Sequence, residues 1–178
     1  MKPSTYIGIG VLSTLIVIAS FAFNNVENNK EEGTITLHKH LEDSDPSCLQ
    51  MYYYIEQYAD SFDIPENYAF GIANSETGYN GPFHWSYNHK QLSSAGAVGP
   101  MQIMPATATM VNGNKVSKTK LKSDVEYNVR TSMKLLRQLY DKYGDWQIVF
   151  GCYNTGRPCV NKYAIKVYNY VPSWKTEK

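Results

Sequence analysis

Glu76 is the residue whose type and position best suit acid–base chemistry. The residues that would share its face of a helix, at spacings of three and four, are Pro65, Tyr68, Ala69, Ile72 and Ala73. A carboxyl group on such an apolar face is either paired or desolvated, and desolvation raises its pKa. A raised pKa is what a general acid requires near neutral pH. The alternative interpretation is a frayed helix end at which Glu76 points into water.

Two other short segments combine polar side chains with structure-breaking residues. Residues 99–102 read Gly-Pro-Met-Gln, a turn sequence with a single amide, and a Met-Pro pair follows at 104–105. Residues 152–156 read Cys-Tyr-Asn-Thr-Gly and end a predicted helix. Taken alone, buried residues of these types serve packing and capping more often than ligand binding.

Apolar spacings and capping residues predict a helical protein. Helices are expected over 47–62, 65–77, 105–110, 123–143, 145–153 and 160–171. A capping box at 123–126 (Ser-Asp-Val-Glu) is predicted to start the longest of them. No run alternates over five residues, so we expect an all-α domain of five to seven helices. The pattern still allows one small β-hairpin near the 79–97 loop.

The overall charge argues against nucleic-acid binding. The 178 residues carry a formal net charge of +1, so a dominant basic field is absent. Fifteen tyrosines are typical of a sugar-binding groove or of a tyrosine-rich core. Residues 115–122 are predicted to form a polar loop with four lysines. These lysines could meet an anionic polymer, and a solvated loop is the simpler interpretation.

The N-terminal segment predicts export. Lys2 precedes an uncharged run from Tyr6 to Phe23, and Ser20 and Ala22 are small residues placed as in a cleavage site. Residues 1–22 are therefore a predicted signal peptide or, because the run is just long enough to span a bilayer, an uncleaved membrane anchor. Residues 23–44 are polar and form a predicted linker. The domain at 45–178 is expected in the periplasm or cell envelope.

The cysteines and histidines form no recognisable metal motif. Cys48, Cys152 and Cys159 include no pair with CxxC spacing. Because export permits disulfides, Cys152 and Cys159 are a candidate local pair, and a buried thiol at Cys152 is the alternative. His84 and His89 would supply only two ligands with no carboxylate nearby. Aromatic lining of a cleft, or packing of the loop over the core, explains this loop better.

Together, the three segments resemble the catalytic domain of the soluble lytic transglycosylases, relatives of goose-type lysozyme. The resemblance covers roughly residues 48–171. Members carry a Glu-Ser pair with an aromatic residue three positions after the Glu, a Gly-Leu-Met-Gln turn followed by Met-Pro, and an Ala-Tyr-Asn-Ala-Gly segment. Two shorter pairs, Asn-Ile and Tyr-Val, also recur. The matching segments here are Glu76-Thr77 with Tyr79, Gly99-Pro100-Met101-Gln102 with Met104-Pro105, Cys152-Tyr153-Asn154-Thr155-Gly156, Asn128-Val129 and Tyr170-Val171.

This resemblance implies a lysozyme-like α domain with a substrate groove and a peptidoglycan lyase activity. Glu76 would protonate the bond between N-acetylmuramic acid and N-acetylglucosamine, and its carboxylate would then accept the proton of the C6 hydroxyl, giving a 1,6-anhydro end. Tyr170 is implied as a hydrogen-bond partner of this carboxyl. The expected partners are glycan strands, the membrane through the N-terminal segment and cell-envelope machinery, whereas no cofactor, metal or nucleic acid is implied. The implied substrate-binding residues are Thr77, Met101, Gln102, Tyr153, Asn154 and Tyr170.

The sequence departs from the family pattern at three positions and leaves two alternatives. Pro100 replaces Leu, Thr77 replaces Ser and Cys152 replaces Ala; the proline removes an N–H and fixes φ, which could reshape the groove. The first alternative is a lysozyme-type hydrolase, which normally needs a second carboxylate to activate water. Between residues 64 and 123 only Glu66 accompanies Glu76. The second alternative is a non-catalytic peptidoglycan-binding module, which an intact Glu76 disfavours.

Overall fold

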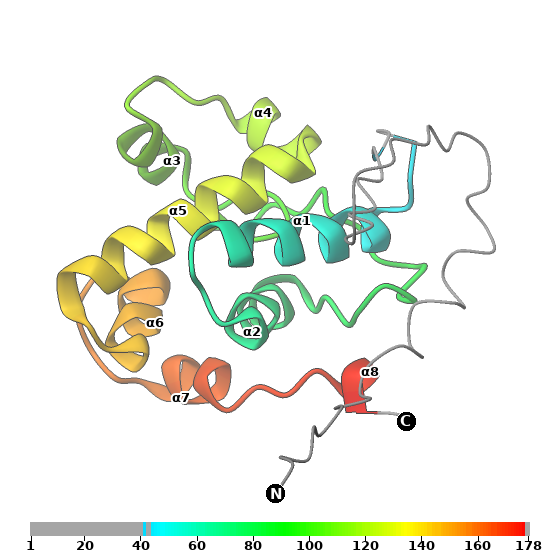
Figure 1. Ribbon diagram of the computed structural model, residues 1–178. Helices are drawn as coiled ribbons and strands as arrows, with labels where there is room; N and C mark the ends of the chain where they lie inside the picture. The colour runs from blue at the N-terminus through cyan, green and yellow to red at the C-terminus, as the bar shows by residue number, and fades with distance from the viewer. Residues whose placement is uncertain (1–40, 42–43, 177–178) are drawn as a thin grey trace, which may run out of the picture. The chain divides into compact units, whose positions relative to one another are not determined.

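The longest helix, α5 (Val125–Tyr143), is the centre of the fold, and α1 (Ser47–Ser61) packs against it more extensively than any other helix (Figure 1). The structure is a computed structural model that describes residues 41 and 44–176. Its regular elements in these residues are eight helices and no strand, which confirms the all-α prediction. The other helices are α2 (Glu66–Thr77), α3 (Pro105–Asn112), α4 (Lys118–Ser123), α6 (Trp146–Thr155), α7 (Lys162–Tyr168) and α8 (Ser173–Thr176).

The N-terminal predictions fall outside this part of the chain. The signal peptide or anchor at 1–22 and nearly all of the linker at 23–44 lie outside the described residues. Among the helices at 44–176, none is long and apolar enough to cross a bilayer.

Helix α2 begins and ends where the sequence predicted. Pro65 immediately precedes it, and Gly78 closes it in the left-handed conformation with φ 69°. The N–H of Gly78 donates to the carbonyl of Asn74 at 3.0 Å, so an otherwise unpaired carbonyl of the last turn is satisfied. The buried residues of α2 are Ala69, Phe70, Gly71, Ile72 and Ala73. Because five consecutive residues cover the full circumference of a helix, the middle of α2 is enclosed on all sides.

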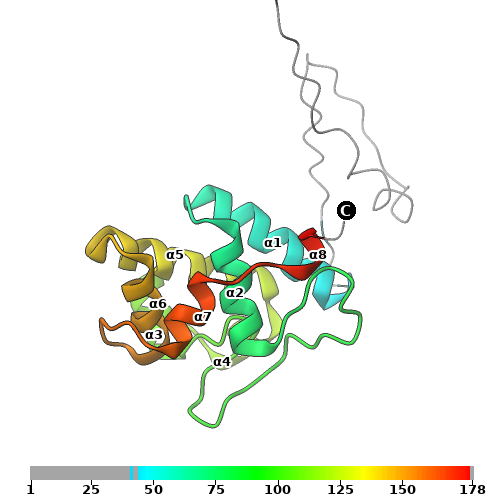
Figure 2. The same cartoon turned by 90° about the horizontal axis from the view of Figure 1, so that it is seen from below.

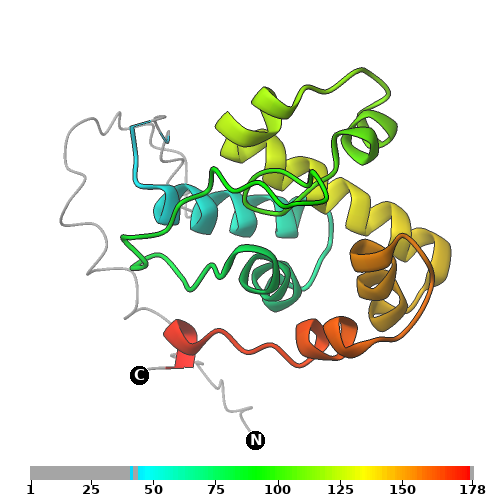
Figure 3. The same cartoon turned by 180° about the vertical axis from the view of Figure 1, so that it is seen from behind.

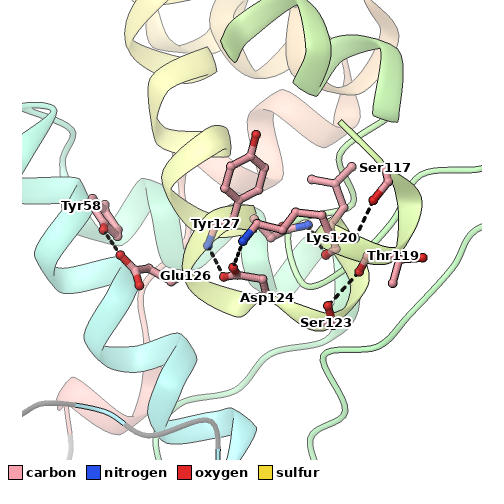
Figure 4. A network of polar contacts seen from close by, with 10 residues as sticks. Tyr58, Ser117, Thr119, Lys120, Ser123, Asp124, Glu126 and Tyr127 are labelled. Carbon is pink, nitrogen blue, oxygen red and sulfur yellow. Dashed lines mark hydrogen bonds and ion pairs between the residues drawn. The ribbon is translucent and has the colours of Figure 1, made fainter. Parts of the chain in front are cut away.

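The segment between α3 and α5 differs from the sequence-based expectation. Part of the predicted basic loop is helix α4, which Ser117 caps by accepting the Lys120 N–H at 3.1 Å (Figure 4). Ser123 belongs to the end of α4, so it is not the N-cap of α5. Asp124 takes that role by accepting the Tyr127 N–H at 2.7 Å.

The role predicted for Glu126 in the capping box is also wrong. The carboxylate of Glu126 accepts a hydrogen bond from the Tyr58 hydroxyl at 2.5 Å and so joins α5 to α1 (Figure 4). The helix predicted for 160–171 is also shorter than expected. Asn161 caps α7 by accepting the Ala164 N–H at 2.8 Å, and the chain leaves the helix at Asn169.

The long segment between α2 and α3 is an irregular chain (Figure 3). The hairpin that the sequence left open does not form, and among the described residues the extended structure is limited to two isolated bridges, Leu92 with Val98 and Val98 with Ile103. Buried side chains fasten this segment to the helices. The Tyr79 hydroxyl donates to the Cys48 carbonyl at 2.9 Å, which joins the start of the segment to α1.

One buried amide fixes the other end of this segment. Asn128 of α5 has no exposed surface, and its Nδ2 donates to the carbonyls of Val98 at 2.9 Å and Leu121 at 3.0 Å. Its Oδ1 accepts the Met101 N–H at 3.1 Å. A Cβ atom at Gly99, whose φ is 79°, would lie 2.3 Å from Asn128 Nδ2 and 2.4 Å from the Leu121 carbonyl oxygen. The amide can reach its partners only because Gly99 has no side chain.

Gly99→Ala should lower the free energy of unfolding by about 2–4 kcal/mol, because steric overlap adds to left-handed strain. Gly113→Ala is the matched control, since Gly113 has a φ of 71° and no atom within 4 Å of the added Cβ. We expect the control to lose about 1 kcal/mol from strain alone. Urea unfolding of both variants makes the comparison, and equal losses would contradict the role given to Gly99.

Candidate active site

Glu76 lies in the last turn of α2 and is half-buried. Burial raises the pKa of the Glu76 carboxyl above its ordinary value, and a hydrogen bond from Tyr163 and the positive charge of Lys166 partly offset this rise. The carbonyl end of α2 acts in the same direction as burial, because the negative end of a helix dipole disfavours a carboxylate. The setting therefore favours the protonated carboxyl and still provides partners for the ionised one.

Tyr163 is the hydrogen-bond partner of Glu76. Its hydroxyl, on α7, donates to Glu76 Oε1 at 2.6 Å. Helices α7 and α2 lie side by side (Figure 2), and they approach so closely that a Cβ at Gly71 would lie 3.1 Å from the Val167 carbonyl oxygen. Burial, followed by the charge of Glu76, raises the pKa of Tyr163 well above its ordinary value. Tyr163 therefore stays a proton donor wherever Glu76 is ionised.

This contact corrects the expectation for Tyr170. The sequence assigned the hydroxyl partner of Glu76 to Tyr170, whereas the structure gives this contact to Tyr163, seven residues earlier. Tyr170 packs against the backbone of α2, where its Cβ is 2.9 Å from the position of a Cβ at Gly71, and its ring lies 6.5 Å from that of Trp174. A substrate contact by Tyr170 stays a prediction.

Tyr153 joins α6 to the 99–102 turn beside Glu76. Its hydroxyl donates to the Met101 carbonyl at 2.7 Å. Burial is the main cause that raises the pKa of Tyr153, and the negative charge of Glu76 is the second. The two tyrosines and the carboxyl thus form one electrostatic cluster, which three different helices supply.

The 99–102 turn accommodates the proline that departs from the family pattern. The Gln102 N–H donates to the Gly99 carbonyl at 3.1 Å, so Pro100 occupies the second position of a four-residue turn. Proline is favoured there because its φ is already set. The Thr77 hydroxyl donates to the Pro100 carbonyl at 2.8 Å and also lies 2.8 Å from the Tyr87 hydroxyl. Thr77 therefore joins the end of α2 to the turn.

The remaining predicted residues differ in their access to a ligand. The Met101 side chain has no exposed surface and is part of the core. Gln102, with a φ of 50°, is half-buried, and its Nε2 donates to the Gly99 carbonyl at 2.8 Å. Asn154 is exposed, and its Oδ1 accepts from Asn161 Nδ2 at 3.2 Å. Asn154 is thus the exposed residue of the predicted set, whereas Gln102 is half-buried, as are Thr77, Tyr153 and Tyr170.

The other sequence candidates give no second centre of chemistry. The three cysteines are free thiols, and Cys152 is buried as the alternative interpretation expected. His89 is buried, with its Nδ1 2.6 Å from Ser47 Oγ. Across the described residues, no three histidine, cysteine or acidic side chains are grouped to hold a metal ion.

Glu66 is poorly placed to act as a second catalytic carboxylate. It lies ten residues before Glu76 on the same helix, a separation of about 15 Å along the axis. Paired carboxylates in hydrolytic glycosidases lie at most about 9.5 Å apart. Glu66 also has its own partner, since one of its oxygens is 2.6 Å from Lys175 Nζ.

The comparison with protein families defines the class of the chain. The family model described as the transglycosylase SLT domain matches residues 53–171. The chain therefore belongs to this family of lytic transglycosylase domains.

Two known relatives support this assignment, and this chain is similar to only a part of each of them. The soluble lytic murein transglycosylase of Escherichia coli (strain K12) is 31% identical over 147 residues, which are 78% of this chain and 21% of that protein. The crystal structure of the 70-kDa soluble lytic transglycosylase from Escherichia coli matches with a TM-score of 0.51 and 29% identity, covering 65% of this chain and 18% of that chain. The chain thus spans about one fifth of its curated relative.

Tyr163→Phe should raise the pKa of Glu76 further, because the hydroxyl it removes stabilises the ionised carboxyl. Tyr170→Phe is the matched control and should leave that pKa unchanged. NMR titration of the glutamate side-chain carboxyl carbons, with the Glu76 signal assigned from its loss in Glu76→Gln, measures both. Equal pKa values in the two variants would remove Tyr163 from the site.

Proposed function

We propose that this protein is a peptidoglycan lytic transglycosylase that cleaves the β-1,4 bond between N-acetylmuramic acid and N-acetylglucosamine and leaves 1,6-anhydro ends. The observation that carries the proposal is the half-buried Glu76 carboxyl, held by Tyr163, in a chain of the SLT family. The relative named as a soluble lytic murein transglycosylase supports the substrate class. We propose that this protein has the same kind of activity as that relative.

In the first step Glu76 acts as the general acid. Its raised pKa keeps a population of the protonated carboxyl, which donates its proton to the glycosidic oxygen. The bond from that oxygen to C1 of the muramoyl sugar breaks, and N-acetylglucosamine leaves with a new hydroxyl. The 2-acetamido oxygen of the substrate bonds to C1 and compensates the positive charge that develops there.

In the second step the same group acts as the base. The Tyr163 hydroxyl and the charge of Lys166 stabilise the Glu76 carboxylate. The carboxylate accepts the proton of the C6 hydroxyl, the C6 oxygen bonds to C1, and the acetamido oxygen departs. Glu76 returns to its protonated form and no water is consumed. Burial favours the acid form and Tyr163 favours the base form, so one carboxyl can serve both steps.

Roles are assigned to the other predicted residues by the exposure of their side chains. The exposed Asn154 and the half-buried Gln102 are proposed to bond to sugar hydroxyl or acetamido groups. Tyr153 and Thr77 hold the 99–102 turn against the end of α2. Met101 supports the turn from the core. A peptidoglycan substrate places the working protein in the cell envelope, in agreement with the export that its N-terminal sequence predicts.

Glu76→Gln should lower the rate of lysis of purified peptidoglycan at least about a hundredfold, because the amide cannot donate the proton. Binding to insoluble peptidoglycan should be retained, since the shape of the side chain is kept. Glu66→Gln, which removes a carboxyl from the same helix, is the matched control and should lyse at the wild-type rate. A wild-type protein that binds without lysis would instead be a binding module, and lysis that survives in Glu76→Gln would exclude Glu76 as the acid.

A further inference from the structure

Positive charge is concentrated in one stretch of the sequence. From Thr77 to Ser123 the chain contains no aspartate or glutamate, whereas residues 45–76 contain acidic residues and no lysine or arginine. The net charge of +1 therefore hides a strong asymmetry, and the part of the surface that 77–123 supplies is basic. The lysines in this stretch are Lys90, Lys115, Lys118, Lys120 and Lys122.

Three of these lysines lie around one depression in the surface. Lys90 comes from the irregular segment between α2 and α3, and Lys118 and Lys122 are one turn apart on α4. Lys118 Nζ is 3.9 Å from the position of a Cβ at Gly96, so the helix and the loop form one continuous surface. All three lysines are exposed, and none of them forms an ion pair within the described part of the chain. Such a surface favours an anionic partner.

Buried contacts hold α4 and the loop in this arrangement. Leu121 has no exposed surface, and its carbonyl accepts a hydrogen bond from Asn128 Nδ2 at 3.0 Å. The same Nδ2 donates to the Val98 carbonyl at 2.9 Å and so holds the loop against α4. Lys120 is turned toward Asp124, with which it pairs at 2.5 Å (Figure 4). The three unpaired lysines therefore keep fixed positions on the surface.

A large apolar side chain lies among the three lysines. Leu92 lines the same depression and is 59% exposed. A soluble polyanion would neutralise the lysines and leave Leu92 in water. A bilayer with anionic headgroups satisfies both, because the apolar side chain enters the boundary between headgroups and acyl chains while the lysine ammonium groups reach the phosphates. The aliphatic stems of the lysines extend the apolar surface around Leu92.

The chain also enters the folded domain beside this surface. Ser47, the first residue of α1, has its Oγ 2.6 Å from Nδ1 of His89, which directly precedes Lys90. Upstream in the sequence is the uncharged run from Tyr6 to Phe23, which is predicted to be a signal peptide or a membrane anchor. An uncleaved anchor would therefore be connected to the domain next to its unpaired lysines.

We infer that the surface made of Lys90, Leu92, Lys118 and Lys122 docks on an anionic phospholipid bilayer. The three lysines contact lipid phosphates, and Leu92 inserts between the headgroups. This inference goes beyond the proposed function and does not depend on it, because no group of the Glu76 cluster takes part.

Amide hydrogen exchange of the full chain, followed by mass spectrometry, tests the docking. The protein is compared in lipid nanodiscs of phosphatidylcholine and in discs in which about one third of the lipid is phosphatidylglycerol. We expect exchange in peptides that cover 90–97 and 117–123 to slow at least about fivefold in the anionic discs, and exchange in α6 to stay unchanged. Equal exchange of the two segments in both kinds of disc would overturn the inference.

Charge variants identify the residues that dock. Lys118→Gln combined with Lys122→Gln should abolish the slower exchange. The matched control combines Lys142→Gln with Lys162→Gln, which removes the same charge from exposed lysines on α5 and α7, and should behave like wild type. The inference is wrong if the two double variants behave alike. Glu76→Gln should dock like wild type, so a failure of the proposed function leaves this test intact.

Leu92→Ser separates a bilayer from a soluble polyanion. This variant keeps all the lysines, so it should bind soluble poly(glycerol phosphate) like wild type in titration calorimetry. In anionic discs it should lose most of the slower exchange, because the leucine no longer contributes buried apolar surface. Undiminished protection in Leu92→Ser, or equal protection of the two segments by poly(glycerol phosphate) without lipid, would show a polyanion site and contradict docking on a bilayer.

Discussion

The burial of one carboxyl group is the constraint on which the candidate site depends. Glu76 lies in the last turn of α2, and partial burial raises the pKa of its carboxyl, while the Tyr163 hydroxyl donates at 2.6 Å and limits that rise. Neither influence alone would suit a group that must release and recover a proton, because burial alone favours the acid and hydrogen bonding alone favours the base. Two helices produce the balance, since α2 carries the carboxyl and α7 carries both Tyr163 and Lys166.

The buried side-chain amide of Asn128 positions the other parts of the site. Asn128 satisfies carbonyls from the 91–99 loop and from α4, and accepts the Met101 N–H of the turn that Tyr153 contacts. A fully satisfied buried polar group specifies one arrangement of the elements around it. The same amide thus holds the turn beside Glu76 and joins the loop at 91–99 to the end of α4.

Local sequence signals predicted the elements that have strong caps and clear apolar faces. Gly78 and Asp145 end and begin helices as expected, whereas the buried residues of α2 run consecutively from Ala69 to Ala73 and do not follow the predicted stripe. Helix α4 was missed because it is one turn and a half of mostly lysine and polar residues, without an apolar stripe. The partner of Glu76 was assigned to Tyr170 instead of Tyr163, because the choice depends on how α7 packs on α2. A tyrosine on an apolar face needs an acceptor for its hydroxyl, and this requirement was the available signal.

The central claim is that one carboxyl serves as acid and then as base, so that an internal hydroxyl takes the place of water. Digestion of purified peptidoglycan in water enriched in heavy oxygen, followed by mass spectrometry of the released muropeptides, tests this claim most directly. A lyase of this kind should release muramoyl ends that are lighter than hydrolysis products by one water and that carry no heavy oxygen. Reducing ends labelled with heavy oxygen would contradict it and would show that the protein hydrolyses the bond.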